Sequence, residues 1–175
     1  MKKIYLKIEE EIFRTGIEKI LEDKYIVREV KNHKTIRKTD LLITDDNIIR
    51  DYSVVIYRDL NVAIYSQAKI KLLRSANREE LLIALDRAVK NEIYTQGTIE
   101  IEEQKLLKFK EQLNKLNSRH KQLVSKILEN KTNREIASEL FLSEKTIKNN
   151  LTELYKILEV KSRADLVKTY KIILT

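Results

Sequence analysis

The sequence predicts an α/β domain on a mainly parallel sheet, followed by an all-α domain of four short helices. In the N-terminal half, short apolar runs rich in β-branched residues alternate with helical patterns. After Leu116 the strand pattern stops, and four helical segments with capping signals follow. The length of 175 residues suits two small domains. We therefore expect an α/β domain at residues 1–96, a helical linker at 97–115 and a helical domain at 116–175.

Periodicity predicts the elements of the α/β domain. Lys2–Ile8 is typical of a strand, and Glu10–Leu21 of a helix, because its apolar residues recur at helical spacing. Arg78–Ile93 predicts a second helix, with Asn77 as its N-cap and Glu80 completing a capping box. Strands mixed with helices in this order favour a parallel sheet. Apolar runs predict the remaining strands at Tyr25–Val30, Leu41–Thr44, Val54–Tyr57, Val62–Tyr65 and Ile70–Leu73.

A polar helix is predicted between the two domains. Gly97 marks a plausible boundary, and Thr98–Lys115 has a helical pattern. Its apolar residues are three, four and three positions apart, which suits either a short coiled-coil seam or a helix that packs on its own domain. These residues are Leu106, Phe109, Leu113 and Leu116.

The C-terminal domain contains four predicted helices with clear ends. Asn117 or Ser118 can cap the first, and Asn130 suits the left-handed residue that ends it. Thr132–Glu135 has the composition of a capping box at the start of a two-turn helix. Ser162 can then start the last helix of the chain.

The second and third of these helices predict a helix-turn-helix. Phe141 and Leu142 form a tight connection, and Ser143 can cap a longer helix at Glu144–Leu158. Lysine can donate to guanine or phosphate, asparagine can pair with adenine, and threonine can contact a base or a thymine methyl. The alternative is an ordinary solvated helix face, in which such residues are common. The outward positions near the start of the longer helix are Lys145, Lys148, Asn149 and Thr152.

Leu116–Val167 resembles the LuxR/FixJ-type DNA-binding domain that ends many bacterial response regulators. The match runs without a gap over 52 residues. The resemblance implies a transcriptional regulator that binds double-stranded DNA as a homodimer, with RNA polymerase as a further candidate partner. The strongest matches are Asn133–Ala137, Leu142–Lys148, Leu158–Val160 and Ser162–Arg163.

The resemblance also implies roles for single residues. It places Lys148, Asn149 and Thr152 on base edges. A dimer surface is implied on the last helix at Leu166, Val167 and Tyr170. Phosphate contacts or helix positioning are implied for Asn133, Lys145, Thr146, Asn150 and Lys161.

Three positions depart from the family pattern. His120 stands where the family usually has Glu, and Asn150 where it usually has His. Glu159 stands where it usually has Gly, and a left-handed backbone there would cost a non-glycine residue about 1 kcal/mol. The first two changes affect phosphate contacts or packing, and the third affects the position of the last helix.

The N-terminal domain is similar in outline to a receiver domain, with Asp45 at the phosphoacceptor position. Receiver chemistry also needs an acidic pair to hold Mg²⁺ and a Lys on the fifth strand. Here Ile8 and Glu9 replace the acidic pair, Arg74 replaces the Lys, and the chain from Asp45 to Arg74 is much shorter than in the family. We therefore expect a degenerate receiver that works without phosphorylation and that dimerises or binds a protein or small ligand.

Composition excludes several classes of site. The chain has no cysteine, only two histidines and two glycines, and therefore no disulfide, thiolate site or glycine-rich phosphate loop. We expect no enzymatic activity, no cofactor and no metal. With no apolar run long enough to cross a membrane, we expect a cytoplasmic protein. The net charge is +8, and residues 97–175 carry 16 basic and 11 acidic residues, which favours nucleic acid there.

Other functions are also compatible with the sequence. A fragment of a sigma factor also ends in a helix-turn-helix, but it would need a helical domain in place of the strand-rich N-terminal half. A phosphotransfer enzyme lacks support from any Ser/His/Asp set or paired histidines. The remaining alternatives are a protein-interaction module that no longer binds DNA and a phosphorylation-dependent regulator that uses Asp45.

Overall fold

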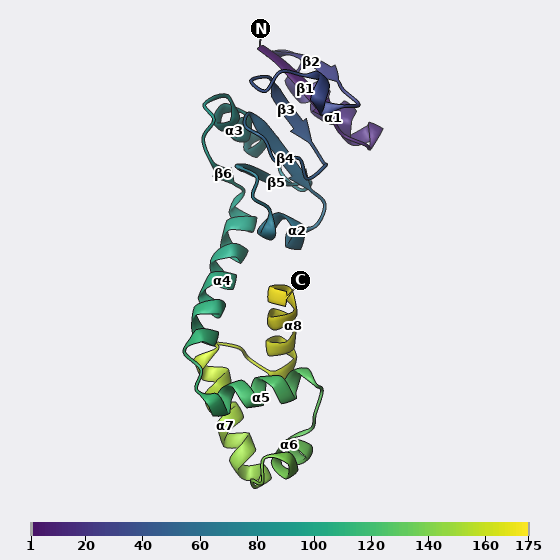
Figure 1. Cartoon of the computed structure of the whole chain (residues 1–175). Coiled ribbons are helices and arrows are strands. Elements are labelled where there is room, and N and C mark those ends of the chain that lie inside the picture. The colour runs from purple at the N-terminus through teal and green to yellow at the C-terminus, as the bar shows by residue number, and fades with distance from the viewer. Residues whose placement is uncertain (1, 175) are drawn as a thin grey trace. The chain divides into compact units, whose positions relative to one another are not determined.

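A computed structural model describes the backbone of residues 2–174 and the side chains of residues 2–171. The chain forms two compact units, residues 1–103 and 104–175 (Figure 1). The division lies inside one long helix, α4 (Gly97–Asn114). Among the described residues, no helix is both long and apolar enough to span a membrane.

The N-terminal unit is built on a six-stranded sheet in which every pairing is parallel. The strand order is β2-β1-β3-β4-β5-β6, so the chain starts one strand in from an edge, adds β2 at that edge, and then adds β3 to β6 in turn on the other side of β1. Ile4 of β1 is in register with Val27 of β2 on one side and with Leu41 of β3 on the other. The strands are β1 (Lys2–Lys7), β2 (Tyr25–Glu29), β3 (Leu41–Thr44), β4 (Ser53–Tyr57), β5 (Ile70–Leu73) and β6 (Tyr94–Thr95).

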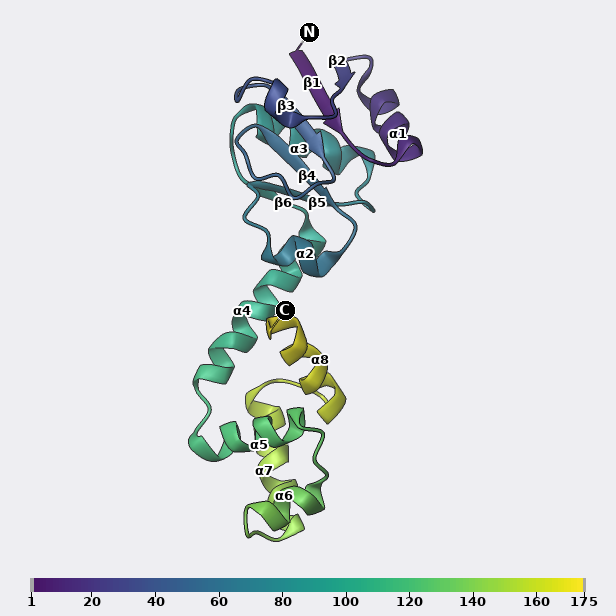
Figure 2. The same cartoon turned by 45° about the vertical axis from the view of Figure 1, so that its right-hand side comes forward.

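Apolar residues cover both faces of the sheet, because successive side chains of a strand point to opposite faces. Helices α1 (Glu11–Leu21) and α3 (Arg78–Val89) pack on one face, where they enclose residues such as Ile56. Val55, the neighbour of Ile56, packs on the other face with α2 (Leu60–Tyr65) and the first turn of α4 (Figure 2). The order of strands and helices confirms the predicted α/β class.

Two of the predicted elements were wrong. Val62–Tyr65 is part of helix α2 and not a strand, because Asp59 caps the helix and accepts a hydrogen bond from the Asn61 N–H at 2.7 Å. Predicted helix Arg78–Ile93 ends at Val89, since Asn91 adopts a left-handed backbone with φ of 56°. Tyr94 and Thr95, which lie just beyond the predicted helix, form β6, a strand that was not predicted from the sequence.

The C-terminal unit consists of the rest of α4 and four shorter helices around one apolar core. Of the two interpretations of α4, packing on its own domain holds for Phe109, Leu113 and Leu116, which lie in this core. Ile127, Ile136 and other residues of the unit fill its centre. The shorter helices are α5 (Ser118–Leu128), α6 (Asn133–Glu139), α7 (Glu144–Ile157) and α8 (Arg163–Leu174).

The helices α5, α6 and α7 end in the same way. Each is followed by one left-handed residue, namely Asn130, Phe141 and Glu159, with φ between 53° and 60°. After α6, for example, Leu142 N–H donates to the carbonyl of Ala137 at 2.9 Å, which is the bond that closes a Schellman motif. The predicted left-handed residues Asn130 and Glu159 are therefore confirmed.

Candidate nucleic-acid interface

Helices α6 and α7 form the helix-turn-helix through two capped starts and one tight turn (Figure 1). The predicted capping box of α6 is present: Glu135 N–H donates to Thr132 Oγ1 at 3.3 Å, and Thr132 N–H donates to Glu135 Oε2 at 2.6 Å. Ser143 caps α7 by accepting from Thr146 N–H at 3.0 Å. Buried Ile136 and Ile147 hold the two helices together.

The outward face of α7 presents three exposed residues near its start: Lys145, Lys148 and Asn149. Their side chains make no hydrogen bond or ion pair in the described part of the chain. Thr152 is also exposed, but its hydroxyl donates to the Lys148 carbonyl at 3.0 Å. Thr152 can therefore offer a methyl group to a partner more readily than a hydroxyl donor.

The residues predicted to contact phosphate or to position the helix fall into two groups. Thr146 and Asn150 are half-buried and use their polar atoms within α7: the Thr146 hydroxyl lies 2.8 Å from Ser143 Oγ, and Asn150 Nδ2 donates to the Thr146 carbonyl at 2.9 Å. These two stabilise the start of α7. Asn133, at the start of α6, and the exposed Lys161 are placed where their side chains remain available.

Arg163 has a structural role that its sequence context does not reveal. Its Nη2 donates to the carbonyls of Ile127 at 3.2 Å and Lys131 at 2.6 Å, so it ties the start of α8 to the end of α5. The Ser162–Arg163 pair was part of the family match, but no local pattern reveals a side chain that reaches a carbonyl 32 residues earlier. The contact therefore holds the start of α8 in place against the end of α5.

Not every basic side chain of this unit is free. Glu139 at the end of α6 lies 2.7 Å from Lys126 Nζ and 2.9 Å from Lys131 Nζ. Hydrogen bonds from these two ammonium groups lower the pKa of Glu139 to about 2. The positive charge of this pair is therefore partly neutralised, whereas that of Lys145 and Lys148 is not.

The three residues of α8 that were predicted to form a dimer surface differ in how deeply their side chains are buried. Leu166 is fully buried in the core of its own unit, and so its side chain is not open to a partner. Val167 and Tyr170 are half-buried against the same core and keep part of their surface exposed.

In the N-terminal unit, Asp45 stands at the end of β3, as expected for a receiver phosphoacceptor, but its surroundings differ. Its side chain is only 4% exposed, lies 3.4 Å from Arg58 Nη2, and accepts from the Glu9 N–H at 3.2 Å. Arg74, which replaces the receiver lysine, is paired with Glu10 instead. Among the described residues, no group of three or more His, Cys, Asp or Glu side chains could hold a metal ion.

Comparisons with known proteins relate the helical unit to one family. Residues 114–170 match the family described as bacterial regulatory proteins, luxR family. The chain is 40% identical over 52 residues to the spore germination protein GerE of Bacillus subtilis (strain 168), which covers 30% of this chain and 70% of that protein.

The whole chain is similar in fold to solved structures. One, described as the two-component response regulator RcsB–DNA complex, has a TM-score of 0.54 at 18% identity and covers 98% of both chains. Another, described as two RcsB dimers bound to two parallel DNAs, has a TM-score of 0.55 at 18% identity with the same coverage. The sheet unit and the helical unit thus follow one another in the order found in these structures.

Proposed function

The chain belongs to the luxR family of bacterial regulatory proteins, and from this we propose that it is a sequence-specific DNA-binding transcriptional regulator. Family membership confirms the resemblance seen in the sequence. The observation that carries the proposal is the outward face of α7, on which Lys145, Lys148 and Asn149 are exposed and free of partners among the described residues.

We place α7 in the major groove, where each group has a chemical counterpart. Lys148 can donate to guanine O6 and N7, Asn149 can pair with adenine, and the methyl group of Thr152 can contact thymine. Lys145 and Lys161 serve as phosphate contacts, and Asn133 adds an amide at the start of α6. Thr146 and Asn150, whose side chains bond within α7, set the position of the helix instead.

We further propose that two copies bind a near-palindromic site. Dimers of helix-turn-helix proteins place their recognition helices about 34 Å apart, one turn of DNA. Dimers on DNA are described for RcsB, and we extend this arrangement to the present chain. Val167 and Tyr170 are the proposed contacts on α8, because each keeps exposed apolar surface, and Leu166 supports them from the core.

Regulation without phosphorylation is the third part of the proposal. The proposal is supported by Arg58, whose Nη2 lies 3.4 Å from the carboxylate of Asp45, a side chain that is only 4% exposed. Asp46, which could have joined a cation site, forms an ion pair with Lys7. Both carboxylates therefore already have a cationic partner from the chain itself, which favours a constitutive receiver over a switchable one.

The experiment that tests the proposal is selection of genomic DNA fragments by the purified, unphosphorylated protein. We expect an enriched motif with approximate two-fold symmetry. Affinity should fall steeply with salt, with a logarithmic slope of about 0.9 per phosphate neutralised. Failure to enrich any motif would contradict constitutive DNA binding and would favour the alternative of a phosphorylation-dependent protein or of a protein-interaction module.

A pair of lysine variants tests the recognition face directly. Lys148→Ala should weaken binding to the selected motif by about 1–3 kcal/mol and relax the preference at one base position. Lys156→Ala is the matched control, because Lys156 is also an exposed lysine and lies in the last turn of the same helix, α7. Equal affinities of Lys148→Ala and the unchanged protein would rule out the assigned base contact.

A further inference from the structure

The turn between α6 and α7 exposes an aromatic ring. Phe141 is 95% exposed, whereas its neighbours Leu140 and Leu142 pack against the core of the C-terminal unit. Its backbone is left-handed, with φ of 54°, a conformation that favours glycine or asparagine at a helix end. The fold therefore gains no core packing from this ring, and the residue type makes the turn harder to form.

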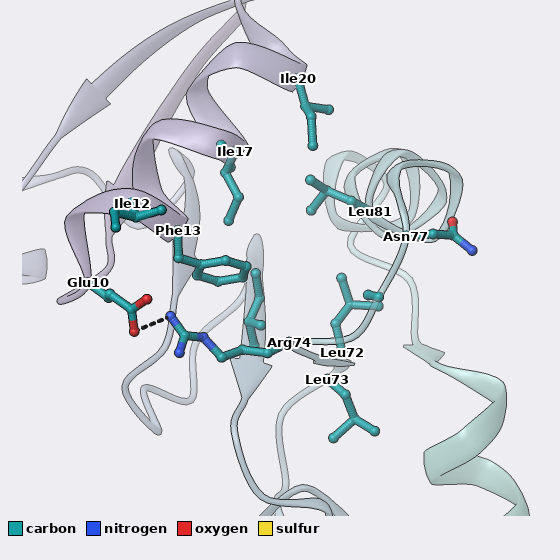
Figure 3. A pocket seen from close by; sticks show the side chains of 13 residues that line it. Glu10, Ile12, Phe13, Ile17, Ile20, Leu72, Leu73, Arg74, Asn77 and Leu81 are labelled. Atoms are coloured by element: carbon teal, nitrogen blue, oxygen red, sulfur yellow. Dashed lines mark ion pairs between the residues drawn. The ribbon is translucent and has the colours of Figure 1, made fainter.

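Two comparisons set Phe141 apart. Ile12 is 83% exposed, but it lies in the regular helix α1 and lines the apolar cavity around Arg74 (Figure 3). Glu159 is also left-handed, but its side chain forms an ion pair with Lys108. Phe141 combines full exposure with a strained backbone, and such outliers are found at functional sites.

The position of the turn indicates what the ring meets. Phe141 stands two residues before Ser143, the N-cap of α7. Recognition helices contact bases through their N-terminal residues, so the ring lies at the end of α7 that enters the major groove in the proposed function. In Figures 1 and 2 this turn is at the end of the C-terminal unit opposite α8, and the ring is therefore remote from the proposed dimer surface.

DNA offers apolar groups to a ring in this place. Thymine methyl groups line the major groove, and phenylalanine is one of the side chains that contact them. The carbon atoms of the deoxyribose lie at the edge of the same groove. Lys145, which is exposed two residues after the cap of α7, can hold a phosphate near the turn and so bring these groups close to the ring.

We propose that Phe141 is a DNA-contacting residue whose ring packs against a thymine methyl or a deoxyribose at the edge of the major groove. The inference rests on the proposed function, because α7 defines where the DNA lies. It adds an uncharged contact from outside the recognition helix to the polar contacts of Lys148 and Asn149.

The variant Phe141→Asn tests the contact, because asparagine lacks the ring and suits a left-handed backbone. We expect it to unfold at a higher denaturant concentration than the unchanged protein, yet to bind the selected motif about tenfold more weakly. These opposite signs exclude a folding defect as the cause of weaker binding. Phe141→Tyr keeps the ring and should bind within about twofold of the unchanged protein.

Two further variants serve as controls. Ile93→Asn removes an apolar side chain that is 75% exposed in the N-terminal unit, and it should leave DNA affinity unchanged. The salt dependence of binding separates an apolar contact from an ionic one. Phe141→Asn should keep the slope of the unchanged protein, whereas Lys145→Ala should lower it by about 0.9.

Replacement of each thymine of the motif by deoxyuridine distinguishes the two DNA groups. If the ring packs on a methyl, one replacement should weaken the unchanged protein by about fourfold and leave Phe141→Asn unaffected. If the ring packs on a deoxyribose, every replacement should affect the two proteins equally, and Phe141→Asn should remain the weaker binder throughout.

Equal DNA affinity of Phe141→Asn and the unchanged protein would overturn the inference, as would an equal loss in Ile93→Asn. Reduced transcription at unchanged DNA affinity would also overturn it, because the ring would then contact a protein partner. Lys148→Ala, measured in parallel, keeps the inference separate from the proposed function. If Lys148→Ala weakens binding and Phe141→Asn does not, only the inference fails, whereas an unchanged protein that selects no DNA contradicts the proposed function itself.

Discussion

At the scale of single residues, the outward side chains of α7 differ in whether their polar atoms are already in use. The side chains of Lys148 and Asn149 make no hydrogen bond or ion pair within the described part of the chain, whereas the Thr152 hydroxyl donates to the backbone carbonyl of Lys148, one turn earlier. An unpaired side chain loses little when it turns to a base edge, but a bonded one must first give up its partner. We therefore expect Lys148 and Asn149 to contribute more to base recognition than Thr152.

Glu139 provides a prediction about pH. Its pKa is about 2 in the folded protein against an ordinary value of 4.5, so the ionised form is favoured by folding. The stability that results is complete above pH 4.5 and is lost as the pH falls toward 2. In Glu139→Gln the side chain cannot ionise, and the dependence of unfolding on pH in this window should become shallower.

The measurement is the urea midpoint of the C-terminal unit, followed through amide signals of α5–α7. The pH is varied from about 5 to about 2, a range that covers the ordinary and the folded-state pKa of Glu139. Glu111→Gln is the control, since Glu111 is exposed on α4 and has no partner among the contacts found. An unaltered pH dependence in Glu139→Gln would mean that the two lysine contacts do not persist in solution.

At the scale of elements, the ends of the helices carry the clearest local strain. Glu159 and Phe141 adopt left-handed backbones that favour glycine, and Phe141 is also 95% exposed. The chain has only two glycines and neither stands at such a helix end. These turns are formed in spite of the residue type, because the closing hydrogen bonds and the buried neighbours fix the backbone.

Glu159→Gly should therefore stabilise the C-terminal unit by about 1 kcal/mol. The variant also loses the ion pair with Lys108 at 2.5 Å, but both side chains are more than half exposed and such pairs contribute about 0–1 kcal/mol. Glu159→Gln loses the pair and keeps the strained backbone. Comparison of the two unfolding free energies in denaturant separates the terms, and a glycine variant no more stable than the glutamine variant would rule out the strain.

The elements also show what could be predicted from the sequence. Strand runs and capping residues predicted β1 to β5 and the four C-terminal helices, because these signals are local. Helix α2 was missed because Val62 and Ile64 are β-branched, and the decisive signal was the Asp59 cap. The two-residue strand β6 is too short to have a pattern of its own, and its place in the sheet comes from its pairing with β5.

The candidate site was predictable to a similar extent. Capping residues set the phase of α7 and therefore revealed which positions face outward. The contacts of Arg163 and the cavity around Arg74 depend on residues far apart in the sequence, and only the folded chain brings them together. The same holds for the ion pair between Arg58 and Asp45. The sequence indicated only that receiver residues are replaced, whereas the structure shows the cationic partner of Asp45.

At the scale of the whole molecule, we expect DNA binding to be indifferent to the state of Asp45. Asp45→Ala removes the receiver position together with its ion pair, and Arg58, which is half exposed, can turn to solvent. The affinity of this variant for the selected DNA should equal that of the unchanged protein. Intact-mass measurement after treatment with a small phosphoryl donor provides a second check, and a labile phosphate on Asp45 would overturn the phosphorylation-independent proposal.

The all-parallel sheet has a consequence for the speed of folding. Pairing Ile4 with Leu41 requires the chain to close a long loop, whereas α5, α6 and α7 form mostly local contacts. After dilution from denaturant, pulse-labelled hydrogen exchange should find α5–α7 protected before β1 and β3. Because the chain has no proline, a slow folding phase cannot come from proline isomerisation. The rate of such a phase would therefore report the rate of strand pairing.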